Sequence, residues 1–484
     1  MARPNYPKVA QIRSVTALHA RLDELGWTIP CDEQLLSADA GSPLAQPLKF
    51  GQMVIGNRWC IHPMEGWDAN RDGSPSELTL RRWRRFGESG AKLIWGGEAA
   101  AVQPQGRANP NQTLATPANE VGLRTLLSVL RDEHLQQYGT CDDLVVGLQL
   151  THSGRFCKPN DHSRWEPRIA FHHPLLDAKF NISADNQAVV LSDAELDSLA
   201  DDYLVAAKLA HRIGFQFVDV KACHGYLLHE LLSARTRPGK YGGDLAGRSH
   251  LLRSVIERIR HECPGLEVGV RLSVFDMLPF QPGADCGEPA SWESGRDYDY
   301  GFGVNPANPL QIDLGEPIEL ISMLQQAGVA MVNLTCGSPY YNPHIQRPAI
   351  FPPSDGYQPP EDPLVGVARH IQAVATVKQA FPQLPIVGSG YTYLQEFLPL
   401  VAQAAVRMGM VDSVGLGRMV LSYPTLPRDS LAGIAPVRKL VCRTFSDCTT
   451  GPRKGLVSGC YPLDQHYKSR PEREQLQAMK IREE

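Results

Sequence analysis

The chain has 484 residues, 43% of them hydrophobic, and a formal net charge of -4. This length and composition suit one large α/β domain with extensions or two ordinary domains, and they exclude disorder throughout. The nearly balanced charge provides no bulk attraction to nucleic acid or to an anionic membrane surface, so we expect a small-molecule substrate as the main partner.

The sequence shows no targeting or membrane signal. No apolar stretch approaches the roughly 20 residues of a membrane span, and the opening residues MARPNYPKVAQIRS lack the apolar region of a secretory signal. Eleven cysteines, an odd number without regular spacing, indicate reduced thiols. We therefore expect a cytoplasmic protein that contacts neither nucleic acid nor membrane.

The chain opens with an extension over residues 1–50, in which one helix is expected from Ser14 to Gly26. Short runs rich in Val, Ile and Leu follow, and they are continuous rather than alternating. Such runs are typical of parallel strands that are covered on both faces. The expected strands are 59–63, 92–98, 143–152, 215–222, 267–273, 330–337, 384–390 and 412–418.

Amphipathic stretches separate these runs and predict helices. The clearest one carries a capping-box pattern, Ser192 with Glu195, and closes at Gly214. The expected helices are 76–89, 119–139, 192–214, 245–262, 316–327, 364–381, 393–408 and 426–441. Strands that each precede a helix predict an α/β fold, a (β/α)8 TIM barrel over residues 51–441.

Two segments lie outside this alternation. Residues 276–314 are longer than a typical loop between a strand and a helix, and they follow the fifth strand, so we expect them to cover the C-terminal mouth of the barrel. Residues 442–484 form a tail that contains Cys442, Cys448 and Cys460.

Polar residues gather where the expected strands end. The active site of such a barrel is built at this end of the strands, so Gln149, Lys221, His224 and Arg271 are candidate site residues. The seventh and eighth strands end in GSG (388–390) and GLGR (415–418). Glycines that lead into a helix offer backbone N–H groups to a phosphate, which predicts a phosphorylated ligand.

Four segments in register, between Leu48 and Pro427, resemble motifs of the Old Yellow Enzyme family. These segments are GNRWCIHPM, QLTHSGR, HGYLLHELLSARTRPGKYGGDLAGR and VDSVGLGRMVLSYPTLP. The resemblance implies a (β/α)8 barrel that binds FMN and takes electrons from NAD(P)H. It also implies that hydride passes from flavin N5 to an α,β-unsaturated carbonyl compound.

The resemblance assigns roles to individual residues. Gln149 matches the pyrimidine edge of the flavin, and Arg271 would lie near flavin N1 and C2=O, where it stabilises the reduced cofactor. His224 would bind the substrate carbonyl oxygen, and Tyr226 would supply a proton to the substrate α-carbon. The other cofactor residues implied are Pro63, Met64, Glu65, Ala101, Gly388, Ser389, Gly390, Gly417 and Arg418.

The chain departs from the family pattern at two of these positions. Lys221 stands where relatives carry histidine, and it either pairs with Asp219 or acts directly on the substrate oxygen. Glu65 stands where relatives carry threonine or cysteine beside flavin C4=O. It lowers the flavin potential or forms an unusual hydrogen bond, or else it turns away to meet an arginine.

The tail resembles another branch of the family in part. Cys448 and Cys460 are spaced like the last two iron–sulfur ligands of the 2,4-dienoyl-CoA reductase and trimethylamine dehydrogenase branch, but only Cys442 stands upstream. Because a [4Fe–4S] cluster normally needs four thiolates, we expect ordinary thiols and no metal site. That branch's dinucleotide domain has no counterpart here, so electrons are expected directly from NAD(P)H.

Two alternative functions fit the same barrel. One is an aldolase-like enzyme in which Lys221 forms a Schiff base with a sugar phosphate. The other is a barrel without flavin that binds a ligand and catalyses no reaction. In each case the extension and the tail are candidates for contacts within a homo-oligomer.

Overall fold

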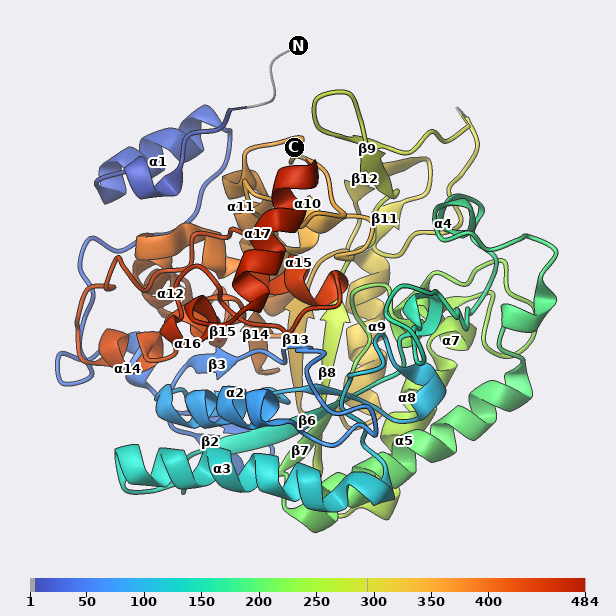
Figure 1. Cartoon of the computed structure of the whole chain (residues 1–484), viewed down its shortest axis with the longest axis horizontal. Coiled ribbons are helices and arrows are strands. Elements are labelled where there is room, and N and C mark those ends of the chain that lie inside the picture. The colour runs from blue at the N-terminus through green and yellow to red at the C-terminus, as the bar shows by residue number, and fades with distance from the viewer. Residues whose placement is uncertain (1–4, 294, 484) are drawn as a thin grey trace.

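A closed parallel barrel forms the centre of the protein (Figure 1). The computed structural model describes residues 5–293 and 295–483. Hydrogen bonding between β4 and β6 closes the sheet, which confirms the TIM-barrel prediction. The barrel strands are β3 (Trp59–Ile61), β4 (Leu93–Ile94), β6 (Val145–Thr151), β7 (Phe217–Val220), β8 (Glu267–Ser273), β13 (Met331–Thr335), β14 (Ile386–Gly388) and β15 (Ser413–Leu416).

Helices cover the outside of this sheet (Figure 1). The strands are buried almost along their whole length, which is why their sequences read as continuous apolar runs. The predicted capping box of α5 is present, because Ser192 N donates to Glu195 Oε2 at 2.8 Å. The main helices are α2 (Glu77–Glu88), α3 (Glu120–Tyr138), α5 (Asp193–Ile213), α8 (His250–Glu262), α9 (Gly315–Gln326), α11 (Pro363–Ala380) and α12 (Leu398–Arg407).

Shorter elements fill the connections. Strand β5 (Ala99–Ala101) extends the sheet beside β6 above the barrel proper. The short helices are α4 (Pro174–Lys179), α6 (Leu227–Leu232), α7 (Leu245–Arg248), α10 (Pro343–Gln346), α13 (Met419–Ser422) and α14 (Leu426–Leu431). Helix α1 (Val15–Glu24) confirms the helix expected in the N-terminal extension, and Ser14 caps it through Ala17 N at 3.1 Å.

A hairpin of β1 (Leu48–Phe50) and β2 (Met53–Ile55) lies against the N-terminal end of the barrel. The ring of Phe50 lies 5.1 Å from that of Phe217, which in turn lies 5.2 Å from that of Trp95. These aromatic side chains fill the barrel floor. Functional groups are therefore left to the opposite, C-terminal end.

Two helix predictions were wrong in extent. Helix α14 ends at Leu431 rather than at residue 441, because Gly433 adopts a left-handed conformation (φ 71°) and Pro436 follows. Helix α12 begins at Leu398 rather than at residue 393. A 3-10 segment, η7 (Tyr391–Phe397), precedes it, and inside this segment Gln395 has a positive φ of 54°.

The long segment after β8 folds into two hairpins. They pair β9 (Phe280–Pro282) with β10 (Gly287–Pro289) and β11 (Val304–Asn305) with β12 (Asn308–Ile312).

The tail forms α15 (Asp447–Arg453), α16 (Gln465–Lys468) and α17 (Glu472–Glu483), drawn in red in Figure 1. Helix α15 packs on the loop after β13, where Ser354 N donates to Thr450 Oγ1 at 3.2 Å. Within the described ranges, none of the helices has the length and apolar character that crossing a bilayer requires.

Candidate active site

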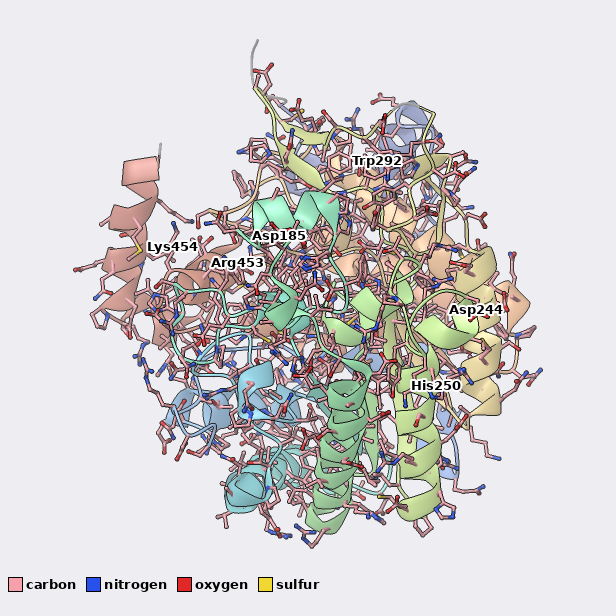
Figure 2. All side chains as sticks on the ribbon, turned by 90° about the vertical axis from the view of Figure 1, so that its right-hand side faces the viewer. Asp185, Asp244, His250, Trp292, Arg453 and Lys454 are labelled. Carbon is pink, nitrogen blue, oxygen red and sulfur yellow. The ribbon has the colours of Figure 1, made fainter. Side chains whose placement is uncertain are left out.

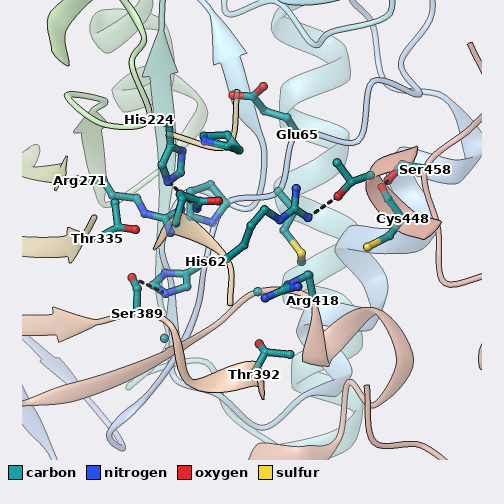
Figure 3. A pocket seen from close by; sticks show the side chains of 18 of the residues that line it. His62, Glu65, His224, Arg271, Thr335, Ser389, Thr392, Arg418, Cys448 and Ser458 are labelled. Atoms are coloured by element: carbon teal, nitrogen blue, oxygen red, sulfur yellow. Dashed lines mark hydrogen bonds between the residues drawn. The ribbon is translucent and has the colours of Figure 1, made fainter. Parts of the chain in front are cut away.

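A cavity of about 220 Å³ opens at the C-terminal ends of the barrel strands (Figure 3). Most of the residues singled out from the sequence line it, although they are far apart in the chain. The predicted residues in its lining are Pro63, Met64, Glu65, Gln149, Lys221, His224, Tyr226, Arg271, Ser389, Gly390, Gly417, Arg418 and Cys448.

Four predicted residues are absent from this lining. Ala101 is buried in β5, and Gly388 is the last residue of β14, directly before Ser389. Cys442 and Cys460 are buried behind the cavity wall. Among the described residues, no group of three or more His, Cys, Asp or Glu side chains is arranged to hold a metal ion.

The tail, rather than the long segment after β8, lines the cavity. Thr449, Pro452, Arg453 and Ser458 contribute to the lining, whereas no described residue of 276–314 does. The segment 276–314 packs beside the loop after β13, where Phe280 N donates to Asn342 Oδ1 at 3.0 Å, and its place over the mouth stays a prediction. Nothing local in the sequence specifies that α15 contacts the rim of the barrel, and the length of a loop does not determine the direction in which the loop runs.

Gln149 and Asp219 form a buried pair between β6 and β7. The Gln149 amide Nε2 donates to Asp219 Oδ2 at 2.5 Å, and the backbone N–H of Arg271 donates to Asp219 Oδ1 at 2.7 Å. Burial raises the pKa of Asp219 to about 6. The proposed ion pair between Asp219 and Lys221 was wrong, because both carboxylate oxygens of Asp219 accept hydrogen bonds from these two N–H donors.

Lys221 pairs with Glu65 instead, across the barrel mouth. The second carboxylate oxygen of Glu65 accepts the Tyr226 hydroxyl at 2.6 Å and the Trp67 indole N–H at 3.2 Å. The Lys221 ammonium also lies 3.7 Å above the Tyr226 ring. The two residues that depart from the family pattern thus compensate each other, and Glu65 meets a lysine rather than the expected arginine.

His224 occupies a strained turn after β7, with a positive φ of 66°. Its backbone N–H donates to Ser273 Oγ at 3.0 Å, and its carbonyl accepts from Ser338 Oγ at 2.8 Å. Burial, followed by the charge of Arg271, holds the pKa of the imidazole well below its ordinary value. The ring therefore faces the cavity in its neutral form, and its Nε2 lies 3.0 Å from Gln346 Nε2.

His62 is a lining residue to which sequence reasoning gave no role, although the quoted motif contains it. Its ring nitrogens lie 3.1 Å from Asn333 Nδ2 and 3.1 Å from Ser389 Oγ (Figure 3). Burial and then Arg271 depress its pKa as well. The neutral ring links β3 to β13 and β14 beneath the cavity.

The cavity end beside β14 and β15 is rich in unpaired guanidinium groups. Arg418 Nη1 is buried without a partner, while its Nη2 donates to Pro348 O at 3.2 Å. Arg347, which the sequence analysis missed, bonds Thr449, and burial together with the Arg418 charge lowers its pKa to about 9. No carboxylate of the described residues forms an ion pair with either arginine. The arrangement suits a bound anion.

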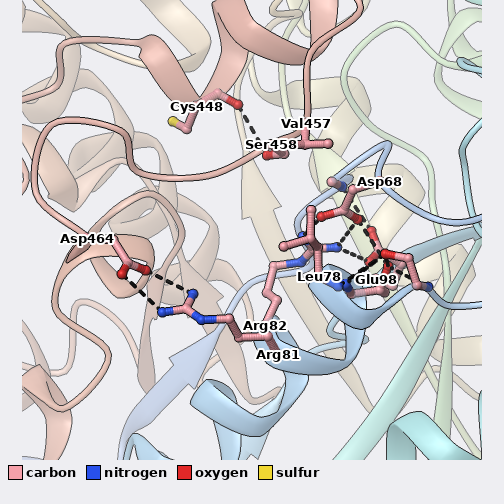
Figure 4. A network of polar contacts seen from close by, with 12 residues as sticks. Asp68, Leu78, Arg81, Arg82, Glu98, Cys448, Val457, Ser458 and Asp464 are labelled. Atoms are coloured by element: carbon pink, nitrogen blue, oxygen red, sulfur yellow. Dashed lines mark hydrogen bonds and ion pairs between the residues drawn. The ribbon is translucent and has the colours of Figure 1, made fainter. Parts of the chain in front are cut away.

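A buried ionic network supports the loop that carries Glu65 (Figure 4). Arg82 of α2 donates to Asp68 at 2.6 Å and to Glu98 at 2.6 Å. Glu98 in turn accepts the Gly66 backbone N–H at 3.0 Å. Burial raises the pKa of Glu98 to about 7, against the lowering effect of Arg82.

A TIM barrel whose rim places arginines, a neutral histidine and a tyrosine around one cavity is consistent with an α/β-barrel enzyme class. The family model described as NADH:flavin oxidoreductase / NADH oxidase family matches residues 43–293, and the chain belongs to this family. The inferred resemblance to the Old Yellow Enzyme family is confirmed.

Several known proteins are similar to this chain in sequence or in fold, at low sequence identity. The NADPH dehydrogenase of Bacillus subtilis (strain 168) is 26% identical over 247 residues, which cover 48% of this chain and 64% of that protein. A 2-naphthoyl-CoA reductase in complex with 2-naphthoyl-CoA aligns with a TM-score of 0.63 at 17% identity, over 89% of this chain and 58% of that one. The old yellow enzyme homologue from Zymomonas mobilis aligns with a TM-score of 0.53 at 19% identity, over 82% and 98%. The two structures support the fold.

Replacing Arg82 by methionine should destabilise the protein by about 3–5 kcal/mol, because Asp68 and Glu98 would lose their shared cation, which leaves a buried charge on Asp68 and favours protonation of Glu98. Urea denaturation followed by tryptophan fluorescence measures the free energy of unfolding. Arg124→Ala is the matched control: this arginine is half exposed on α3, and its removal should leave that free energy almost unchanged. Equal stability of Arg82→Met and the wild type would contradict a structural role for the network.

Proposed function

We propose that the protein is an FMN-dependent NAD(P)H oxidoreductase that reduces the C=C bond of an α,β-unsaturated carbonyl compound. One observation carries the proposal. A single cavity joins Arg418, whose Nη1 lacks a partner, the flavin-type residues Gln149 and Arg271, and the pair His224 and Tyr226. When bound, FMN supplies the redox chemistry by accepting hydride from the nicotinamide and delivering it to the substrate.

The residues present fit the phosphate end of FMN. Arg418 has a buried guanidinium N–H without a partner, and Arg347 lies beside it. A Cβ built on Gly417 would meet nothing within 4 Å, so the backbone there is open to the cavity. Gly390 adopts a left-handed conformation (φ 94°) directly before the 3-10 segment. These groups would hold a phosphate dianion.

Gln149 and Arg271 would hold the flavin ring system. Because Asp219 accepts from the Gln149 NH2 group, the Gln149 carbonyl oxygen is left to accept an imide N–H of the pyrimidine edge. Arg271 Nε is buried without a partner. Its positive charge would favour an anionic reduced ring.

His224 and Tyr226 would act on the substrate. A neutral imidazole has one N–H to donate to the substrate carbonyl oxygen, where it stabilises developing negative charge. Tyr226 would give its proton to the α-carbon. Burial and the charge of Glu65 raise the pKa of its hydroxyl, and the Lys221 ammonium 3.7 Å above its ring would offset part of the charge of the tyrosinate. Lys221 also neutralises Glu65, so Glu65 brings no unpaired negative charge to the flavin.

The structure disfavours the aldolase-like alternative. A Schiff-base lysine attacks as a free amine, whereas Lys221 is engaged in an ion pair with Glu65 and lies over an aromatic ring. Lys221 is better suited to a positioning role for Tyr226 and Glu65.

The purified protein should bind FMN and become yellow, and anaerobic NADH or NADPH should bleach its visible absorption band. An enone such as 2-cyclohexenone should then restore the oxidised spectrum. Tyr226→Phe should slow only this second step, by about 100-fold or more, because the step loses its proton donor. A protein that refuses FMN, or a reduced flavin that no enone reoxidises, would refute the proposal.

Arg418→Ala should weaken FMN binding by about 10- to 100-fold, because the variant loses charged hydrogen bonds to the phosphate. Quenching of FMN fluorescence during titration of the apoprotein measures the dissociation constant. Arg428→Ala is the matched control, since Arg428 is half exposed on α14 and lies outside the cavity lining. Similar FMN affinities for the two variants would contradict the assigned phosphate site.

Lys221→Met should make the flavin midpoint potential more negative, because Glu65 would then oppose the anionic reduced ring. The expected shift is on the order of 30 mV, which corresponds to about 1.4 kcal/mol for a two-electron couple. The double variant Lys221→Met/Glu65→Gln should restore the potential, since both charges are gone. Dye-coupled spectroscopic titration measures it, and an unchanged potential in Lys221→Met would exclude charge compensation.

A further inference from the structure

A second cavity, also of about 220 Å³, lies directly beside the candidate active site. We call it the side cavity and define it by Lys158, Trp165, Ser354, Asp355 and Arg453. Trp67, Tyr340, Pro452 and Arg453 line both cavities and form their common wall. Figure 2 shows Arg453 and Lys454 on the side of the molecule that carries α17.

The side cavity contains an ammonium group that forms no direct ion pair, although the Asp355 carboxylate lies in the same lining. Lys158 Nζ donates to the carbonyl of His162 at 3.0 Å and lies 3.6 Å above the Trp165 ring. In the described part of the chain no carboxylate forms an ion pair with it, whereas Arg453 pairs with Asp355. Burial lowers the pKa of Lys158, and the charges of Asp355 and Asp161 oppose this lowering only in part.

A hydroxyl in the same lining also lacks a partner. Ser354 Oγ is buried and makes no hydrogen bond, although its backbone N–H is engaged with Thr450. A buried polar atom that is left unsatisfied destabilises the structure. A ligand that accepts a hydrogen bond from this hydroxyl would remove this destabilisation.

An aromatic wall leads from the reacting groups to this charge. The Tyr340 hydroxyl lies 3.0 Å from that of Tyr226, and the Tyr340 ring stacks on Phe156 with centroids 3.8 Å apart. The Trp165 ring lies 6.4 Å beyond Tyr340, edge to face. The Arg453 guanidinium lies 5.3 Å over the Tyr340 ring. A flat or aliphatic stem would pass along these rings toward Lys158.

We propose that the side cavity binds an anionic group, a carboxylate or a phosphate, on a molecule whose reactive end lies at Tyr226. Lys158 supplies the charge, Ser354 Oγ a hydrogen bond, and Tyr340 and Trp165 the apolar path between the two ends. The inference rests on the proposed function, because it places the reactive end over the flavin. The anion belongs either to the substrate or to the nicotinamide nucleotide.

The two half-reactions of the FMN-loaded enzyme separate these sources. Stopped-flow reduction by NADH and by NADPH gives the nucleotide dissociation constants. Reoxidation by 4-oxo-4-phenylbut-2-enoic acid and by its methyl ester gives the constants for an anionic enone and its neutral partner. The wild type, Lys158→Gln, Lys158→Arg and a surface control, Lys208→Gln on α5, are compared.

Lys158→Gln should reduce the preference for the acid over the ester by about tenfold if the substrate carries the anion. If the nucleotide carries it, the same variant should weaken NADH or NADPH binding by about tenfold. Lys158→Arg should retain most of the effect, and Lys208→Gln should match the wild type. Unchanged constants in both half-reactions would overturn the side-cavity proposal while leaving the proposed function intact. Failure of every enone to reoxidise the flavin would refute the proposed function itself.

Discussion

The rim of the barrel is governed by one constraint, the need to compensate charge where water is scarce. The strands are buried almost completely, so an ionised side chain at a strand end finds its partner across the mouth or remains costly. Lys221 and Glu65 satisfy each other in this way, and Asp219 is satisfied by two N–H donors. Arg418 Nη1 and Arg271 Nε are left without partners in the cavity, which explains why it suits an anionic, phosphorylated cofactor.

The same constraint connects the two unusual residues of the chain. A glutamate beside a flavin opposes reduction, and a lone lysine in the place of a histidine changes the charge near the substrate. Placed together they cancel, and the pair also holds the hydroxyl of Tyr226. The charge compensation depends on Lys221 and Glu65 together. The effect of either departure from the family pattern therefore cannot be interpreted without the other.

The C-terminal tail contributes residues to the lining of the cavity at the C-terminal end of the barrel. Helix α15 brings Thr449 and Arg453 over the rim, where they meet Arg347 and the loop after β13. Pro452 and Arg453 of the tail line both the main cavity and the side cavity. The tail, which the sequence analysis singled out mainly for its cysteines, forms one wall of the candidate active site.

The barrel and the strand-end residues were predictable from the sequence by itself. Continuous apolar runs and the polar residues that end them follow local rules of strands and turns, so Gln149, His224 and Arg271 were assigned to one rim, and the family resemblance added Tyr226. Only the tertiary structure decided that Lys221 meets Glu65, that Arg347 joins Arg418, and that the tail lines the cavity. Those contacts join positions far apart in the chain, and no local preference of either partner specifies the distance between them.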